Sequence, residues 1–92
     1  MLACRVVRSV ISSRKNEKLT GCKFLLLEPL EKDIYTQGDS FIAVDNIGAG
    51  EGEKVLVTLG SSARLACNMP DAPIDAAIVG IIDEGTYRGT YQ

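Results

Sequence analysis

The fold is decided by the middle of the chain, residues 41–60, with the sequence FIAVDNIGAGEGEKVLVTLG. Apolar residues, many of them β-branched, alternate in Ser40–Asp45 and again in Glu53–Leu59, and this alternation predicts two strands. The segment between them, Asn46–Gly52, carries three glycines at alternate positions. Such spacing is typical of a turn, because glycine readily adopts the positive φ angles that turns require. We therefore expect two strands joined by a glycine-rich loop, with Gly60 ending the second strand.

Three other segments have the composition of strands. Leu2–Ile11 is rich in β-branched residues, Cys22–Leu30 is apolar on both of its faces, and Ile74–Ile82 is the most apolar part of the chain. We expect Cys22–Leu30 to be covered on both sides. Pro29 is expected to end the pairing of this strand, because proline has no N–H to donate.

The first strand contains an irregularity. Arg8 falls on the same side of Leu2–Ile11 as the apolar residues. Either a bulge near Val7 redirects this side chain, or the inner face of the strand is open to solvent at that level. The pattern leaves both alternatives open.

One short helix is predicted after Gly60. Ser61 or Ser62 is expected to cap a single helical turn through Leu65 and Ala66, because a hydroxyl can accept hydrogen bonds from the free N–H groups of a first turn. No longer amphipathic helix is predicted elsewhere in the chain.

Five short strands and one helical turn predict an all-β protein, a small five-stranded OB-like β-barrel. The chain has 92 residues, which fits one domain, and we place this domain at residues 1–83 with a C-terminal tail at 84–92. Aromatic residues make up 5% of the chain, so the core must be aliphatic. A domain of this size buries only about 60 to 65% of the surface that its unfolded chain exposes, so we expect association with other copies.

Charge and cysteine usage exclude several classes of function. Ten Lys and Arg against twelve Asp and Glu give a net charge of −2, which argues against nucleic acid as the main partner. No apolar stretch approaches the roughly 18 residues of a membrane span. The three cysteines are widely spaced and the chain has no histidine, so neither a zinc site nor another cofactor is expected. We expect a cytoplasmic protein with reduced thiols.

An enzyme is not expected either. The acidic residues that could form a catalytic pair have no spacing that places two of them in one cleft, and three of them lie at predicted strand ends; they are Asp45, Asp71, Asp75, Asp83 and Glu84. Ser61 and Ser62 have no histidine to act as a base. The glycine run is followed by a strand, whereas phosphate-binding loops lead into a helix. A turn is therefore favoured over a ligand loop.

Several blocks of sequence, taken in order, point to one family. They are Arg5-Val6, Lys15, Leu19–Leu27, Ala43–Glu53 (AVDNIGAGEGE), Val55–Val57, Gly60–Arg64 (GSSAR) and Ile74–Asp83 (IDAAIVGIID). This arrangement closely resembles the EutN/CcmL family of bacterial microcompartment vertex proteins, and the likeness runs from about Leu2 to Asp83. Members of that family usually carry glycine where this chain has Arg8.

The resemblance implies a structural shell protein of a bacterial microcompartment in the cytoplasm. It implies a ring-shaped homopentamer that caps the fivefold vertices of the shell, with hexameric and trimeric shell proteins as partners. It also implies a set of residues at the subunit interface or beside a central pore, namely Asp45, Gly48, Gly50, Gly52, Glu53, Gly60, Ser61, Ser62, Ala63 and Arg64. A closed ring of identical subunits needs two unlike patches on each subunit.

Two alternatives remain open at this point. The first is an OB-like binding module for an oligonucleotide or a small ligand, because the segment Arg5–Lys23 is basic and OB-like barrels bind single strands. The second concerns Arg64, whose guanidinium suits either an exposed position or a carboxylate across an interface.

Overall fold

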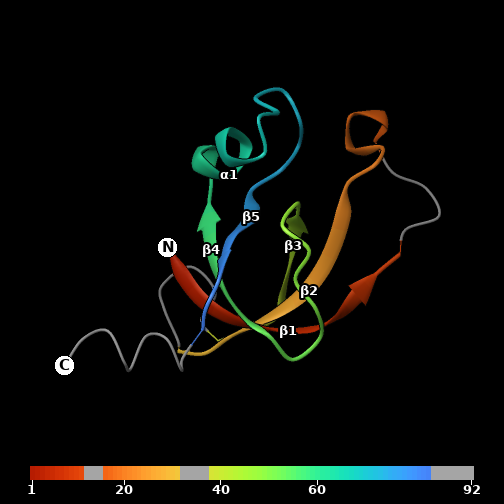
Figure 1. Cartoon of the computed structure of the whole chain (residues 1–92). Helices are drawn as coiled ribbons and strands as arrows, with labels where there is room; N and C mark the ends of the chain where they lie inside the picture. Colours follow the sequence, from red (N-terminus) through yellow and green to blue (C-terminus); the bar gives the residue numbers. More distant parts are fainter. Residues whose placement is uncertain (12–15, 32–37, 84–92) are drawn as a thin grey trace.

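The protein is a closed five-stranded barrel, as the sequence predicts (Figure 1). The computed structural model describes residues 1–11, 16–31 and 38–83. The elements are β1 (Leu2–Val10), the 3₁₀ turn η1 (Glu17–Leu19), β2 (Lys23–Pro29), β3 (Phe41–Asp45), β4 (Lys54–Leu59), α1 (Ser61–Ala66) and β5 (Ala76–Ile81). The strands close in the order β1-β2-β3-β5-β4, and β3 and β5 pair in parallel while the other neighbours are antiparallel.

Neither of the described helices has the length and apolarity that crossing a membrane requires. The predicted tail, residues 84–92, lies outside the described residues, so the expected domain boundary stays a prediction.

The turn η1 was not predicted. It begins where the Asn16 side chain accepts a hydrogen bond from the Lys18 N–H at 2.9 Å, a local cap of the kind that asparagine favours.

The interior of the barrel is aliphatic. Alternate residues of each strand point inward, and among the residues that the structure describes no aromatic side chain is fully buried in the core. Its members come from all five strands and from one loop: Cys4, Val6, Leu25, Leu27, Ala43, Ala49, Val55, Val57, Ala76 and Ile78. Leu25, Leu27 and Ile78 are the largest of these side chains. Small residues such as the alanines leave room for them at the centre.

The glycine-rich loop after β3 covers one part of this core. Ala49 is 3% exposed and packs with the barrel residues, although it belongs to no strand. The Asp45 carboxylate holds the loop in place: Oδ1 accepts hydrogen bonds from the N–H groups of Ile47 and Gly48 at 2.9 and 3.1 Å, and Oδ2 accepts one from Ala49 at 2.9 Å. The Lys23 Nζ lies 4.0 Å from Oδ2. One buried carboxylate therefore satisfies three consecutive backbone donors.

A second, smaller core lies outside the barrel wall. Ala63 of α1 and the segment after it pack on Val44 and Ala77, and Phe24 of β2 borders the same cluster. Ala72 and Ile74 supply the rest of the cover. The expectation that Cys22–Leu30 is covered on both sides is thus confirmed only for its first part, because Cys22 and Phe24 pack on this cluster whereas Glu28 is exposed.

Two local expectations about strand geometry are confirmed. The β1–β2 register shifts between Val6 and Arg8, and Arg8 is exposed, so the bulge near Val7 is confirmed. Pro29 is the last residue of β2 and of its register with β1, where it pairs with Cys4, so the pairing of this strand ends at Pro29 as expected. At this position the ladder uses the N–H of Leu30, which donates to the Ala3 carbonyl at 2.9 Å, so the missing N–H of proline costs nothing.

The predicted serine cap of α1 was wrong. The helix begins at Ser61, its N-cap residue is Gly60, and no side chain caps it. Gly60 has a φ of 67°, which reverses the chain directly after β4, and its N–H donates to the Asp75 carbonyl at 2.9 Å. Ser61 and Ser62 therefore lie inside the first turn, one and two residues too late to cap it.

Asp45→Asn tests the contribution of the carboxylate to stability. An asparagine places an NH₂ group against one of the three backbone donors, so at least one charge-assisted hydrogen bond is lost at a buried position. We expect a loss of about 2 kcal/mol in the free energy of unfolding, measured by denaturation at fixed protein concentration. Asp71→Asn, at an exposed carboxylate, is the control and should have no measurable effect. Equal stability of the two variants would contradict the assignment.

Candidate subunit interface

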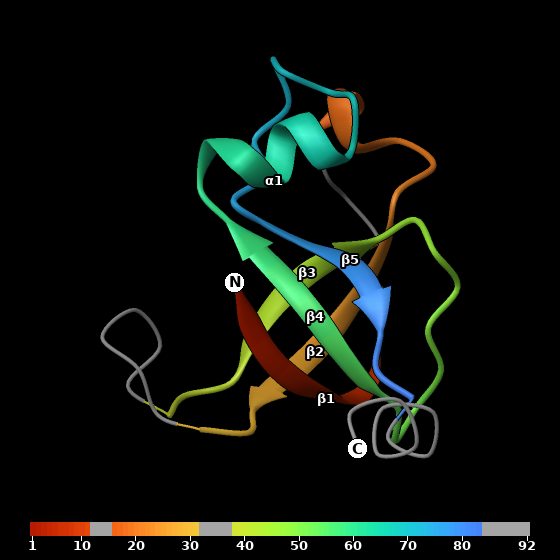
Figure 2. The same cartoon turned by 60° about the vertical axis from the view of Figure 1, so that its left-hand side comes forward.

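The predicted interface residues fall into two blocks that β4 separates. The loop block ends at Gly52 and Glu53, directly before β4, and the helix block, Gly60–Arg64, follows its last residue. Six residues of strand span about 20 Å at roughly 3.3 Å per residue. Figure 2 shows α1 at one end of the barrel and the loop reaching the start of β4 at the other. The loop block begins near the helix end, because Asp45 is level with Ile78 and Val57, and its last residues, Gly52 and Glu53, lie at the opposite end of β4.

Within the loop block, the residues divide into buried supports and an exposed edge. The Asp45 side chain is fully buried, and the exposed residues are Gly48, Gly50, Gly52 and Glu53. The edge has its own hydrogen bonds: the Glu53 Oε1 accepts from the Gly50 N–H at 2.6 Å, and the Gly52 N–H donates to the Val6 carbonyl at 2.9 Å. Hydrogen bonds within the loop and to β1 therefore give this edge a defined conformation.

The three glycines of the loop have different reasons to be glycine. Gly48 and Gly52 adopt φ angles of 97° and 84°, which other residues adopt only with strain. Gly50 does not have a positive φ, and a Cβ built there would lie 3.4 Å from the Glu53 Oε1. The backbone of the subunit therefore does not itself require glycine at position 50.

The helix block also mixes buried and exposed residues. Ala63 is fully buried in the second core, whereas Gly60, Ser61 and Ser62 are exposed. The Arg64 Nη1 donates to the Ile74 carbonyl at 3.3 Å, which ties α1 to the segment before β5. Arg64 is half-buried, so part of its side chain remains accessible to solvent or to a neighbouring subunit.

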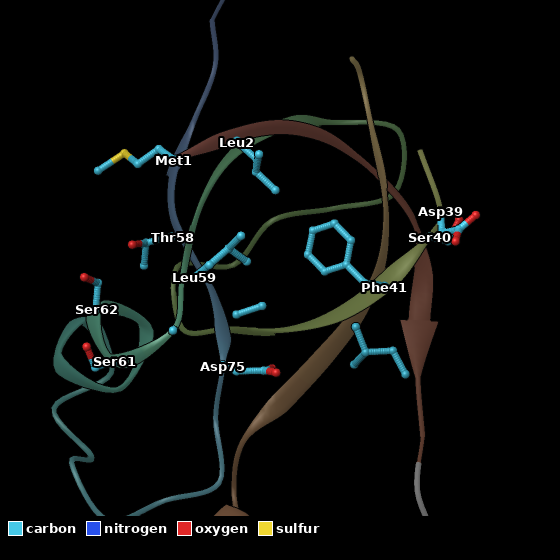
Figure 3. Close-up of a pocket in the computed structure, with 13 residues that line it drawn as sticks. Met1, Leu2, Asp39, Ser40, Phe41, Thr58, Leu59, Ser61, Ser62 and Asp75 are labelled. Atoms are coloured by element: carbon cyan, nitrogen blue, oxygen red, sulfur yellow. The ribbon is translucent and has the colours of Figure 1, made fainter. Parts of the chain in front are cut away.

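A hollow lies beside the helix block, at the mouth of the barrel (Figure 3). Leu2, Phe41 and Leu59 point toward one another across it, and Ser61 and Asp75 stand on its rim. The lining combines apolar side chains with serine hydroxyls and the carboxylates of Asp39 and Asp75, and the chain has no histidine to complete a serine–histidine pair. Across residues 1–11, 16–31 and 38–83, no group of three or more His, Cys, Asp or Glu is placed to hold a metal ion.

Sequence reasoning missed one feature of this surface, an uncharged row across three strands. Ala3 pairs with Leu56, and Leu56 pairs with Gly80, so the three lie in register on the outside of β1, β4 and β5. Leu56 is 38% exposed although it is a leucine in a strand. The signal was present in the alternation of β4, because Val55 and Val57 point inward and Leu56 must then point outward.

Comparisons with known proteins match the whole barrel. The profile of the family described as "Ethanolamine utilisation protein EutN/carboxysome" matches residues 1–83. The bacterial microcompartment shell vertex protein GrpN of Rhodospirillum rubrum is 43% identical over 79 residues, which cover 86% of this chain and 89% of GrpN. The carboxysome shell vertex protein CcmL of Thermosynechococcus vestitus is 48% identical over 83 residues, which cover 90% of this chain and 84% of CcmL. The chain belongs to the EutN/CcmL family.

Solved structures support the same assignment. The GrpN pentameric microcompartment shell protein from Rhodospirillum rubrum superposes with a TM-score of 0.76 at 42% identity, covering 90% of this chain and 94% of that chain. A solved ethanolamine utilization protein EutN superposes with a TM-score of 0.78 at 36% identity, covering 90% and 86%. As a EutN/CcmL protein, the chain is a pentameric shell vertex protein of a bacterial microcompartment, with a structural and non-enzymatic role.

Glycine substitutions separate the two reasons for glycine in the EutN/CcmL loop. Gly52→Ala forces an alanine into a positive φ and should destabilise the fold by about 1 kcal/mol. Gly50→Ala meets one flexible carboxylate oxygen at an ordinary contact distance and should change the free energy of unfolding by less than about 0.5 kcal/mol. Denaturation curves of the two variants measure the difference. A larger loss for Gly50→Ala would contradict this reading.

Proposed function

We propose that five copies of this chain form a ring whose rim docks against hexameric and trimeric shell proteins and so closes a fivefold vertex. The observation that carries the proposal is the match of the complete barrel to pentameric shell proteins, with 94% of the GrpN chain covered at 42% identity. Hexagonal tiles alone make flat sheets, and a fivefold unit supplies the curvature that closes a shell. No reaction chemistry is needed for this function.

The ring contact that we propose joins the loop block of one subunit to the helix block of the next. A closed ring of identical subunits uses two unlike patches, and the exposed end of the loop block, Gly52 and Glu53, lies at the opposite end of β4 from the helix block. The loop edge is exposed and held by its own hydrogen bonds, so it is formed before a neighbour arrives. Of the predicted residues, Asp45 and Ala63 act from inside the subunit: one shapes the loop and the other seats α1.

The outer row Ala3, Leu56 and Gly80 extends this contact. An uncharged row across three strands offers a flat apolar surface, and burial of such a surface drives association. Gly80 leaves Leu56 uncovered on one side, since a Cβ built at Gly80 would already lie 3.7 Å from the Leu56 Cδ1. A neighbouring subunit would remove this leucine from water.

The alternative of an oligonucleotide-binding module gains no support from the described aromatic residues. Phe24 packs against the second core, and Phe41 lines the mouth of the barrel among apolar neighbours. Single-strand binding on OB-like barrels uses aromatic side chains on which the bases stack, next to a basic groove. Neither phenylalanine is placed in that way beside the basic segment.

Shell reconstitution tests the proposal. A hexameric shell protein mixed with the wild-type protein should give closed polyhedral bodies in electron micrographs, and without it open sheets or tubes. Leu56→Glu places a charge in the proposed contact and Gly50→Val adds bulk to it, so both should lower the fraction of pentamer and of closed bodies at least tenfold.

Ile11→Glu is the matched control, because Ile11 is 94% exposed just past the end of β1 and takes the same charge outside the proposed contact. It should assemble like the wild type. Closed bodies formed without the protein would overturn the vertex role. Intact pentamers of Leu56→Glu would instead refute the placement of the contact and leave the role standing.

A further inference from the structure

Two of the three cysteines lie together at the edge of the second core. The Cys22 Sγ lies 4.0 Å from the Met69 Sδ, although the two residues are 47 positions apart. Cys67 follows α1 directly, two positions before Met69, and packs against the same cluster of buried residues as Cys22. Cys4, by contrast, is fully buried inside the barrel. The structure therefore sets a pair of accessible thiols apart from a third, enclosed one.

The Cys67 thiol is also affected by its surroundings. Burial raises the pKa of the Cys67 thiol, and the negative charge of a Cys22 thiolate raises it further. Both cysteines are half-buried free thiols, so a small oxidant can reach them.

We infer that Cys22 and Cys67 form a reversible intramolecular disulfide, a redox-dependent link between the start of β2 and the end of α1. Backbone hydrogen bonds at the end of α1 are local: the Cys67 N–H donates to the Ala63 carbonyl at 3.1 Å, and the Met69 N–H donates to the Arg64 carbonyl at 2.9 Å. A covalent bond to β2 would fix this end of the helix to the barrel wall. The inference goes beyond the shell function and does not depend on it.

The oxidation proceeds by thiol–disulfide exchange with a small disulfide such as oxidised glutathione. The Cys22 thiolate attacks one sulfur of the oxidant and releases one glutathione thiolate, and burial, which raises the pKa of the Cys67 thiol, disfavours Cys67 in this first step. Cys67 then loses its proton to water and attacks the Cys22 sulfur, which releases the second glutathione thiolate. The two protein thiols lose two electrons and two protons, and one glutathione disulfide becomes two thiols.

Peptide mapping tests the inference on the full-length protein. The reduced protein is incubated with oxidised glutathione, alkylated with iodoacetamide and digested with trypsin. The three cysteines fall on three different tryptic peptides, residues 1–5, 19–23 and 65–88. We expect the last two peptides to be joined, with the loss of two hydrogen atoms from the intact mass, and the peptide of Cys4 to be alkylated after unfolding.

The single variants serve as controls. Cys67→Ser should accumulate one glutathione on Cys22, and Cys22→Ser should accumulate one on Cys67 several-fold more slowly. Joined peptides that contain Cys4, disulfide-linked dimers on a non-reducing gel, or wild-type protein that keeps glutathione on Cys22 would each overturn the inference. Because all readouts are covalent masses, the outcome is distinguishable from any failure of ring assembly.

Discussion

The rest of the structure depends on the buried carboxylate of Asp45. Three consecutive N–H groups of the glycine-rich loop donate to its two oxygens, and this fan of hydrogen bonds turns the chain back over the barrel. The turn brings Ala49 into the core and delivers Gly52 to its hydrogen bond with Val6, where β4 begins. The same hydrogen bonds to Asp45 therefore help to close the core and shape the exposed edge of the loop. Glycines at positions 48 and 52 provide the backbone freedom that this path requires.

A small barrel built in this way has reasons to assemble. Its core is aliphatic and contains several alanines, so the apolar area buried within one subunit is limited. Leucine and glycine remain on the outside of β4 and β5, where burial by a neighbour would add to stability. The family relationship and the physical need for association therefore point to the same ring. The carboxylates of Asp45 and Glu53 accept hydrogen bonds from backbone N–H groups of their own chain, as expected if the loop has a structural and not a catalytic role.

Sequence reasoning succeeded for features that depend on the local pattern of residues. Alternation and apolar runs located all five strands, and the misplaced charge of Arg8 pointed to a bulge as one of two alternatives. It failed where the outcome depends on a distant partner. The start of α1 depends on the reversal at Gly60, which Asp75 supports from another segment.

The candidate site divides in the same way. The family resemblance pointed to both blocks, yet the burial of Asp45 and Ala63 could not be read from a motif, because burial is a property of the folded chain. The row formed by Ala3, Leu56 and Gly80 was missed because it exists only through the register of three strands. Likewise, the proximity of Cys22 to Met69 depends on how the segment after α1 folds back on β2.

Native mass spectrometry of the purified, reduced protein tests the central claim most directly. The mass of one chain is 9.9 kDa, so a ring of five is well separated from a monomer, dimer or hexamer. The account predicts one dominant species at five chain masses, which persists on dilution to micromolar concentration. A dominant monomer or a hexamer under these conditions would contradict it.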